Sequence, residues 1–371
     1  MTARKTLTLV ARITVSAAML GYLAYKINST SHPHGGGSQQ PILPTWSAHT
    51  ASWLALALAI TFFGTIVCSF RWRAVLQGLE VTPLPPSKRL VEHYLAGHFV
   101  GNVLPSTVGG DVLRVSRLSK DTNEGPISFA SVVLERLTGW LVLPVLILVG
   151  FAINRGLLKL GRATHVALVI AAITLVMLVL VLLALSSRHL GGRLGHTQGW
   201  RRFAAAVHLA TAHLRHHPVR ALTIIGWGFA YQVTMVLAAY CAARTLGVSA
   251  VGPTALLTFY PAVLIVQVLP ISIAGFGIRE GLFVLFLHPL GVPDGKAVAL
   301  GILIYLLALV VSLFGAPAFA FGNRRDAAAA RAAGTEAGAE QHADAEAEPF
   351  ADHPTGAAPR GGRGARPAAA R

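Results

Sequence analysis

Four acidic residues of this chain each lie close to a basic residue, in or beside apolar sequence. The pairs are Glu92 with His93, Asp111 with Arg114, Glu135 with Arg136, and Glu280 with Arg279. Charges inside a bilayer are costly, so such residues mark either a functional site or ion pairs that fix helix packing. Arginine suits a functional site, because its planar guanidinium donates paired hydrogen bonds to phosphate. The pattern predicts an anion site in which acids hold the arginines in place or titrate.

Two of these pairs end a sequence pattern that occurs twice. Residues 104–114 and 269–280 both begin with Leu-Pro, continue through small residues and two glycines, and finish with an acid near an arginine. Asn102 and Gln267 precede the two patterns at matching places, each separated from the Leu-Pro by one valine. Paired helix breaks in the two halves of a membrane chain are typical of a transporter binding site, although two coincidental loops would give the same pattern.

The candidate site combines these breaks with the charges, because free N–H groups at a break and the helix start that follows it favour anions. The predicted substrate-binding residues are Asn102, Gly109, Gly110, Asp111, Arg114, Gly275, Gly277, Arg279 and Glu280, with Glu92, Glu135, Arg136 and Gln267 in support. Histidines 213, 216 and 217 cluster without acids or thiols, so a zinc site is not expected. The sequence has no P-loop and no dinucleotide-binding fingerprint, so no other cofactor is expected.

The elements that must position these residues are membrane helices. Of 371 residues, 54% are hydrophobic and only 12% are charged, about half the charged share of a soluble domain. Stretches long enough to cross a bilayer are 6–25, 51–70, 127–152, 164–186, 219–243 and 297–321. The predicted fold is an all-α polytopic membrane protein with about six full transmembrane helices.

Two further segments, 90–118 and 254–293, are interrupted by the breaks and are predicted to be re-entrant helical hairpins. Placed by the positive-inside rule, they approach the membrane midplane from opposite faces, which predicts an inverted repeat. Arg4 and Lys5 place the N-terminus in the cytoplasm, and the last span returns the C-terminus there. The expected location is the cell membrane.

The formal charge of +16 lies entirely in the predicted membrane domain, residues 1–322, which holds 24 Lys and Arg against eight acids. Residues 323–371 hold seven of each sign and are rich in Ala and Gly, so they should form a disordered cytoplasmic tail. Since the positive charge sits in short loops beside apolar spans, anionic lipids are the expected partner and nucleic acid is not.

At these residues the chain resembles the membrane region of the lysylphosphatidylglycerol synthase family, also called flippase-like proteins. The resemblance covers roughly residues 5–322 and rests on three motifs. They are Gly101-Asn102 through Gly109-Gly110-Asp111 and Arg114; Glu135-Arg136 with Gly139; and Pro270-Ile271-Ser272 through Gly275, Gly277 and Arg279-Glu280-Gly281. Ala274 departs from a more typical Gly-Gly pair. These 371 residues do not include the aminoacyl-transfer domain that some members carry, so lysyl-lipid synthesis is not expected.

What the resemblance implies is a lipid-translocation role with no assigned substrate. The leading hypothesis is a protein that moves an anionic phospholipid or lipid-linked phosphate between leaflets. One alternative is a membrane-embedded enzyme, with Asp111 and Glu135 as acid and base, or an accessory subunit working with enzymes of envelope assembly. An ion-coupled transporter of a small solute and a purely structural scaffold are the others.

Overall fold

The protein is helical through most of the chain that the computed structural model describes, with no strand in that part. The described residues are 21, 46–103, 108–186, 206–208, 210–212, 216–269, 272 and 275–322. Five helices in this set are long and apolar enough to cross a membrane: Ala48–Gly78, Gly125–Ile153, Arg162–Leu183, Pro218–Thr245 and Asp294–Gly322. They match five of the six predicted spans. The sixth, 6–25, and the tail, 323–371, lie outside the described residues except for Gly21.

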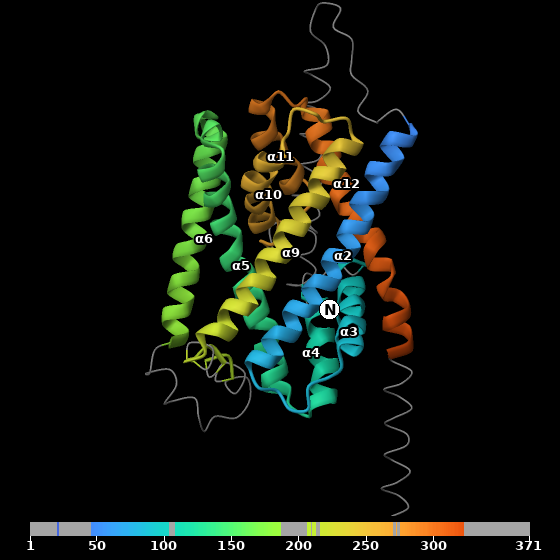
Figure 1. The fold of residues 1–371 in the computed structure, drawn as a ribbon, viewed down its shortest axis with the longest axis vertical. Coiled ribbons are helices and arrows are strands. Elements are labelled where there is room, and N and C mark those ends of the chain that lie inside the picture. The colour runs from blue at the N-terminus through green and yellow to red at the C-terminus, as the bar shows by residue number, and fades with distance from the viewer. Residues whose placement is uncertain are drawn as a thin grey trace, which may run out of the picture. The chain divides into compact units, whose positions relative to one another are not determined.

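The long helices alternate in direction within the compact unit formed by residues up to Ala320. In Figure 1, α2 (Ala48–Gly78), α6 (Arg162–Ser186) and α12 (Asp294–Leu313) run downward, whereas α5 (Gly125–Ile153) and α9 (Pro218–Thr245) run upward. Helix α2 has 31 residues, or about 46 Å at 1.5 Å per residue. It therefore extends well beyond the 20 residues that a membrane crossing needs.

Each predicted hairpin consists of two shorter helices flanking a break. Helices α3 (Ser87–Val103) and α4 (Gly109–Thr122) pack together in the lower half of Figure 1. Helices α10 (Pro253–Gln267) and α11 (Ile278–Leu287) do the same in the upper half. The two pairs thus occupy opposite ends of the unit. The residues at the centres of both breaks lie outside the described set.

Short connections complete the path between these elements. Two 3₁₀-helices, Arg155–Lys159 (η1) and His288–Leu290 (η2), follow α5 and α11. Helix α12 contacts both α11 and α3, so it links the two broken pairs.

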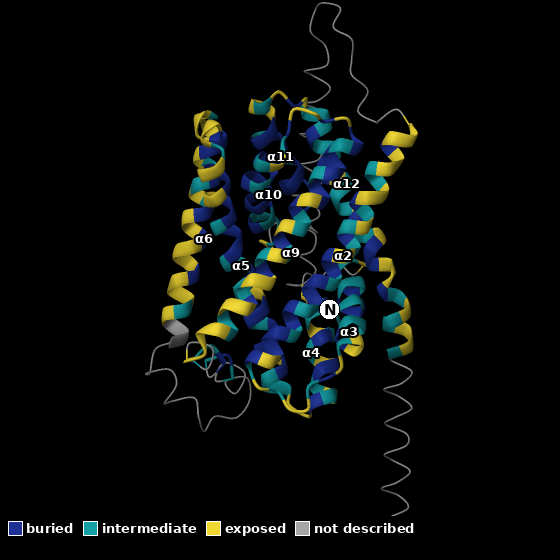
Figure 2. Cartoon of the chain, in the orientation of Figure 1, coloured by how far each residue is buried: buried dark blue, intermediate teal, exposed yellow. Residues whose placement is uncertain are grey.

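The core is built mainly where α5, α9 and α12 surround the upper broken pair. Phe259 of α10 stacks on Phe286 of α11 with ring centroids 5.0 Å apart, and Tyr260 stacks on Phe283 at 6.0 Å. Figure 2 shows this interior as buried and the outer side of α6 as largely exposed. Exposed apolar side chains on a membrane-length helix are those expected to face lipid.

Candidate functional site

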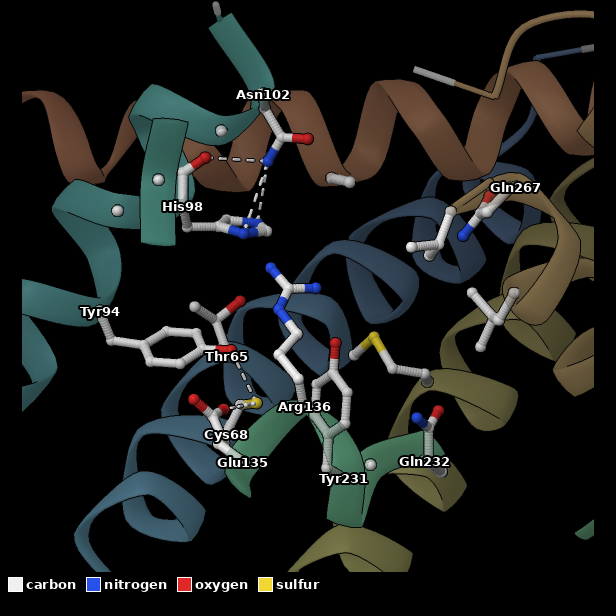
Figure 3. A pocket seen from close by; sticks show the side chains of 18 of the residues that line it. Thr65, Cys68, Tyr94, His98, Asn102, Glu135, Arg136, Tyr231, Gln232 and Gln267 are labelled. Atoms are coloured by element: carbon white, nitrogen blue, oxygen red, sulfur yellow. Dashed lines mark hydrogen bonds between the residues drawn. The ribbon is translucent and has the colours of Figure 1, made fainter. Parts of the chain in front are cut away.

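A cavity of 410 Å³ lies between the two broken pairs and is lined by residues of α2, α3, α4, α5, α9, α10, α11 and α12. Asn102 and Asp111 come from the lower pair, and Gln267 and Arg279 from the upper pair. Figure 3 shows Arg136 extending into the cavity between Tyr231 on one side and His98 with Asn102 on the other. The two sequence patterns, about 165 residues apart, therefore contribute residues to the same cavity.

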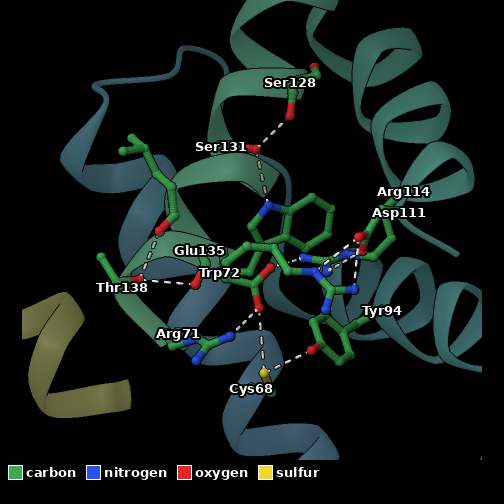
Figure 4. Close-up of polar contacts among 12 residues, drawn as sticks. Cys68, Arg71, Trp72, Tyr94, Asp111, Arg114, Ser128, Ser131, Glu135 and Thr138 are labelled. Carbon is green, nitrogen blue, oxygen red and sulfur yellow. Dashed lines mark hydrogen bonds and ion pairs between the residues drawn. The ribbon is translucent and has the colours of Figure 1, made fainter. Parts of the chain in front are cut away.

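Three buried charged residues on the cavity wall form a network centred on Glu135 of α5 (Figure 4). Nη2 of Arg71 donates to Oε1 of Glu135 at 2.8 Å, and Nη2 of Arg114 donates to Oε2. All three residues are at most 6% exposed. Because a buried charge without a partner is strongly destabilising, Glu135 must hold α2 and α4 against α5.

Aromatic rings enclose the Arg114 side of this network. The guanidinium carbon of Arg114 lies 4.2 Å from the centroid of the Trp72 ring and 4.3 Å from that of Tyr94. A desolvated cation–π contact contributes about 2 kcal/mol. The Trp72 indole N–H also donates to Ser131 at 3.1 Å, which fixes the ring. Arg114 is thereby immobilised on three sides.

Asp111, in the first turn of α4, forms a second and more open ion pair. It accepts from Nη2 of Arg136 at 2.7 Å, while Nη1 of Arg114 lies farther away, at 3.6 Å. The Arg136 side chain is 50% exposed and that of Asp111 is 21% exposed. Exposed ion pairs contribute little to stability, so this pair opens at far lower cost than the Glu135 network.

The upper break positions Arg279 through its neighbour Glu280. Glu280 is 0% exposed and accepts from Nη2 of Arg279 at 2.8 Å. Its other oxygen accepts from the Gly277 backbone N–H at 2.7 Å, which satisfies a free donor at the start of α11. The Arg279 guanidinium also lies 5.1 Å from the Tyr305 ring. Arg279 lines the cavity, while Glu280 lies behind it.

Glycines at the breaks allow the close approaches on which this geometry depends. A Cβ added to Gly110 would lie 2.2 Å from the carbonyl oxygen of Gly97, so α3 and α4 touch there through backbone atoms. Gly275 has φ of +77° and faces Gln267, where an added Cβ would meet the Gln267 Cβ at 3.0 Å. Both contacts exclude larger side chains.

The predicted site residues divide into those that line the cavity and those that do not. The lining residues are Asn102, Gly110, Asp111, Arg114, Glu135, Arg136, Gln267 and Arg279. Gly109, Gly275, Gly277, Glu280 and Glu92 are not among them. The ion pairs differ from the predicted neighbours in two places. Glu135 bonds Arg71 and Arg114, whereas its neighbour Arg136 bonds Asp111. His93, predicted to pair with Glu92, bonds Asp121 at 2.9 Å.

Sequence reasoning missed Arg71, Cys68 and Tyr94. Arg71 comes directly after the predicted span 51–70, and Cys68 lies inside that span. In the structure the Cys68 thiol contacts Oε1 of Glu135 at 3.4 Å, and the Tyr94 hydroxyl donates to Cys68 at 2.7 Å. No sequence pattern marked Arg71, because only the structure shows that its helix continues to Gly78.

The fold and cavity together define a multipass, all-helical membrane protein with a charged internal site. The chain belongs to the family described as the lysylphosphatidylglycerol synthase TM region, which it matches over residues 9–315. This family implies a membrane protein that handles lipids. A comparison with curated proteins found no match for this chain.

Proposed function

We propose that this protein moves an anionic phospholipid or lipid-linked phosphate between membrane leaflets, with the head group bound in the cavity. The observation that carries the proposal is the charge of the wall. Four arginines line it: Arg71, Arg114, Arg136 and Arg279. They are matched by three carboxylates, Asp111 and Glu135 on the wall and Glu280 bonded to Arg279 behind it, which leaves an excess of one positive charge. Arginine binds phosphate through paired donors, so a phosphate head group would balance this excess.

The open ion pair suggests how the phosphate binds. Arg136 reaches into the cavity and is half exposed, and Asp111 is its partner. An incoming phosphate would replace Asp111 on Arg136, and Asp111 would recover the arginine when the phosphate leaves. The Glu135 network stays closed in this scheme and supplies a fixed positive field.

Apolar residues beside the cavity favour a lipid over a free solute. Val108, just before α4, and Val112, which follows Asp111 on α4, are 59% and 61% exposed. Acyl chains would find apolar surface there while the head group reaches the arginines. The second broken pair, reached from the other end, supplies Arg279, so a head group passing between the pairs meets an arginine on each side.

For the membrane arrangement, we propose that the lower end in Figure 1 faces the cytoplasm, with both termini on that side, and that α3–α4 and α10–α11 are re-entrant. The membrane would be the cell membrane, and enzymes that make or use the lipid during envelope assembly are the proposed partners. Short basic loops at the cytoplasmic ends of spans support this orientation.

The test measures lipid head-group accessibility in proteoliposomes made from the purified chain and lipids extracted from the native membrane. We expect Arg279→Ala to reduce transfer at least tenfold, since it removes the cavity's upper arginine. Arg279→Lys keeps a positive charge beside Glu280 and serves as the folding control. Arg162→Ala, an exposed arginine outside the cavity, should transfer lipid normally. Equal transfer by the Arg279→Ala and Arg162→Ala variants would refute the site.

A further inference from the structure

Two side chains on the cavity wall have hydrogen-bond donors or acceptors without a partner among the described residues. The carboxamide oxygen of Gln232 is buried and has no hydrogen-bond partner among them. Nε and Nη1 of Arg71 are likewise buried without a partner in the described set. Both residues are 6% exposed and both line the cavity. Buried polar groups are normally paired, so an unfilled acceptor and two unfilled donors here point to a ligand.

Both groups lie beside Tyr231, Arg71 in space and Gln232 in sequence. The Arg71 guanidinium carbon lies 5.3 Å from the ring centroid of Tyr231, which precedes Gln232 on α9. Arg71 is held in place by its bond to Glu135. Figure 3 shows Tyr231 and Gln232 across the cavity from His98 and Asn102. Besides the arginines, the cavity therefore offers a fixed surface with both hydrogen-bond donors and an acceptor.

The charges on the wall determine which chemistry fits this surface. An ammonium group would need a carboxylate, but Glu135 already bonds two arginines and Asp111 already bonds Arg136. The excess of arginine would also repel a cation. A hydroxylated substituent has neither problem, because one hydroxyl can donate to the Gln232 oxygen and another can accept from Arg71.

We propose that the cavity selects a phosphate whose substituent is uncharged and hydroxylated, such as glycerol or a sugar, over one that carries an ammonium group. This rests on the proposed function, in which the phosphate occupies the same cavity. The volume of 410 Å³ falls in the range of small-ligand sites and leaves room for a small polyol beside the phosphate. Gln232 acts here as a specificity residue for the substituent and has no part in holding the phosphate.

The test measures binding of short-chain lipids to the purified full chain in detergent by isothermal titration calorimetry. The probes are dihexanoyl phosphatidylglycerol, dihexanoyl phosphatidylmethanol and dihexanoyl phosphatidylethanolamine. The first two carry the same single negative charge, and only the first has hydroxyl groups. We expect phosphatidylglycerol to bind about fivefold more tightly than phosphatidylmethanol, the effect of about one hydrogen bond. Phosphatidylethanolamine should bind more weakly than both.

The key variant is Gln232→Leu, which keeps the size of the side chain but removes the acceptor. It should abolish the preference for phosphatidylglycerol and leave phosphatidylmethanol binding within twofold of the wild type. Gln77→Leu, an exposed position on α2 outside the cavity, should preserve the preference. Circular dichroism and gel-filtration profiles of both variants establish folding.

Different outcomes separate this inference from the proposed function. Equal or tighter binding of phosphatidylethanolamine, or an equal loss of both anionic lipids in folded Gln232→Leu, overturns the selection of a hydroxylated group. Failure of folded wild-type protein to bind any phosphodiester overturns the phosphate site itself, and the inference with it. Free sn-glycerol 3-phosphate, if it binds as tightly as phosphatidylglycerol, supports the hydroxyl preference but identifies a soluble ester as the ligand.

Discussion

Replacing Glu135 by Gln should destabilise this protein far more than the same change at an exposed ion pair. The substitution preserves the shape of the side chain but leaves Arg71 buried without a negative partner and Arg114 with only Asp111, 3.6 Å away. Removing one partner of a buried ion pair costs about 3–5 kcal/mol. Because Glu135 accepts from two arginines, we expect a loss near the upper end, about 5 kcal/mol.

The matched control is Glu80→Gln. Glu80 accepts from Arg220 at 2.5 Å, but their side chains are 55% and 42% exposed. Surface ion pairs contribute about 1 kcal/mol or less. Both variants therefore remove a carboxylate bonded to arginine and differ mainly in burial.

The measurement is unfolding of the purified chain in mixed micelles, followed by circular dichroism as the denaturing detergent increases. Glu135→Gln should shift the midpoint strongly and Glu80→Gln barely. Adding Arg71→Met to Glu135→Gln should recover part of the loss, because one unneutralised charge is removed. If the two single variants unfold at the same midpoint, the claim that this network holds α2, α4 and α5 together is wrong.

Two further predictions concern packing and the tail. Gly110→Ala should destabilise the chain in the same unfolding assay, because the new methyl group would lie 2.2 Å from the Gly97 oxygen. The control is Gly226→Ala, which should have no such effect because a Cβ there would have nothing within 4 Å. Deleting residues 326–371 should leave lipid transfer in proteoliposomes intact, and a truncated chain that fails to insert or transfer would contradict the prediction of a dispensable tail.

The long helices could be predicted from sequence because membrane burial needs only length and apolar composition. Five spans predicted this way are helices in the structure. The helix ends were harder to predict. Phe70 closes an apolar run already long enough to cross a bilayer, so the arginine after it resembled a boundary. Helix α2 instead continues to Gly78, because Arg71 finds a buried carboxylate on a neighbouring helix.

The breaks and their charged residues could also be located from sequence, but their partners could not. A neighbour in sequence is the simplest partner to propose, and it is right for Arg279 with Glu280. It fails for Glu135, whose partners lie 64 and 21 residues away. On α5, Glu135 and Arg136 point in directions about 100° apart, so adjacent residues reach different helices. Only the packing of α2 and α4 against α5 determines which arginine each carboxylate meets.

The arginines of the cavity therefore divide into two kinds with different consequences for transport. Arg71 and Arg114 are immobilised by Glu135, and opening their bonds would expose buried charge. Arg136 is bonded to a partly exposed Asp111 and can exchange partners at small cost. A translocator must release what it binds, so tight and permanent neutralisation of a phosphate would oppose turnover. On the proposed function, the fixed pair attracts the head group, and the Asp111–Arg136 pair allows it to leave.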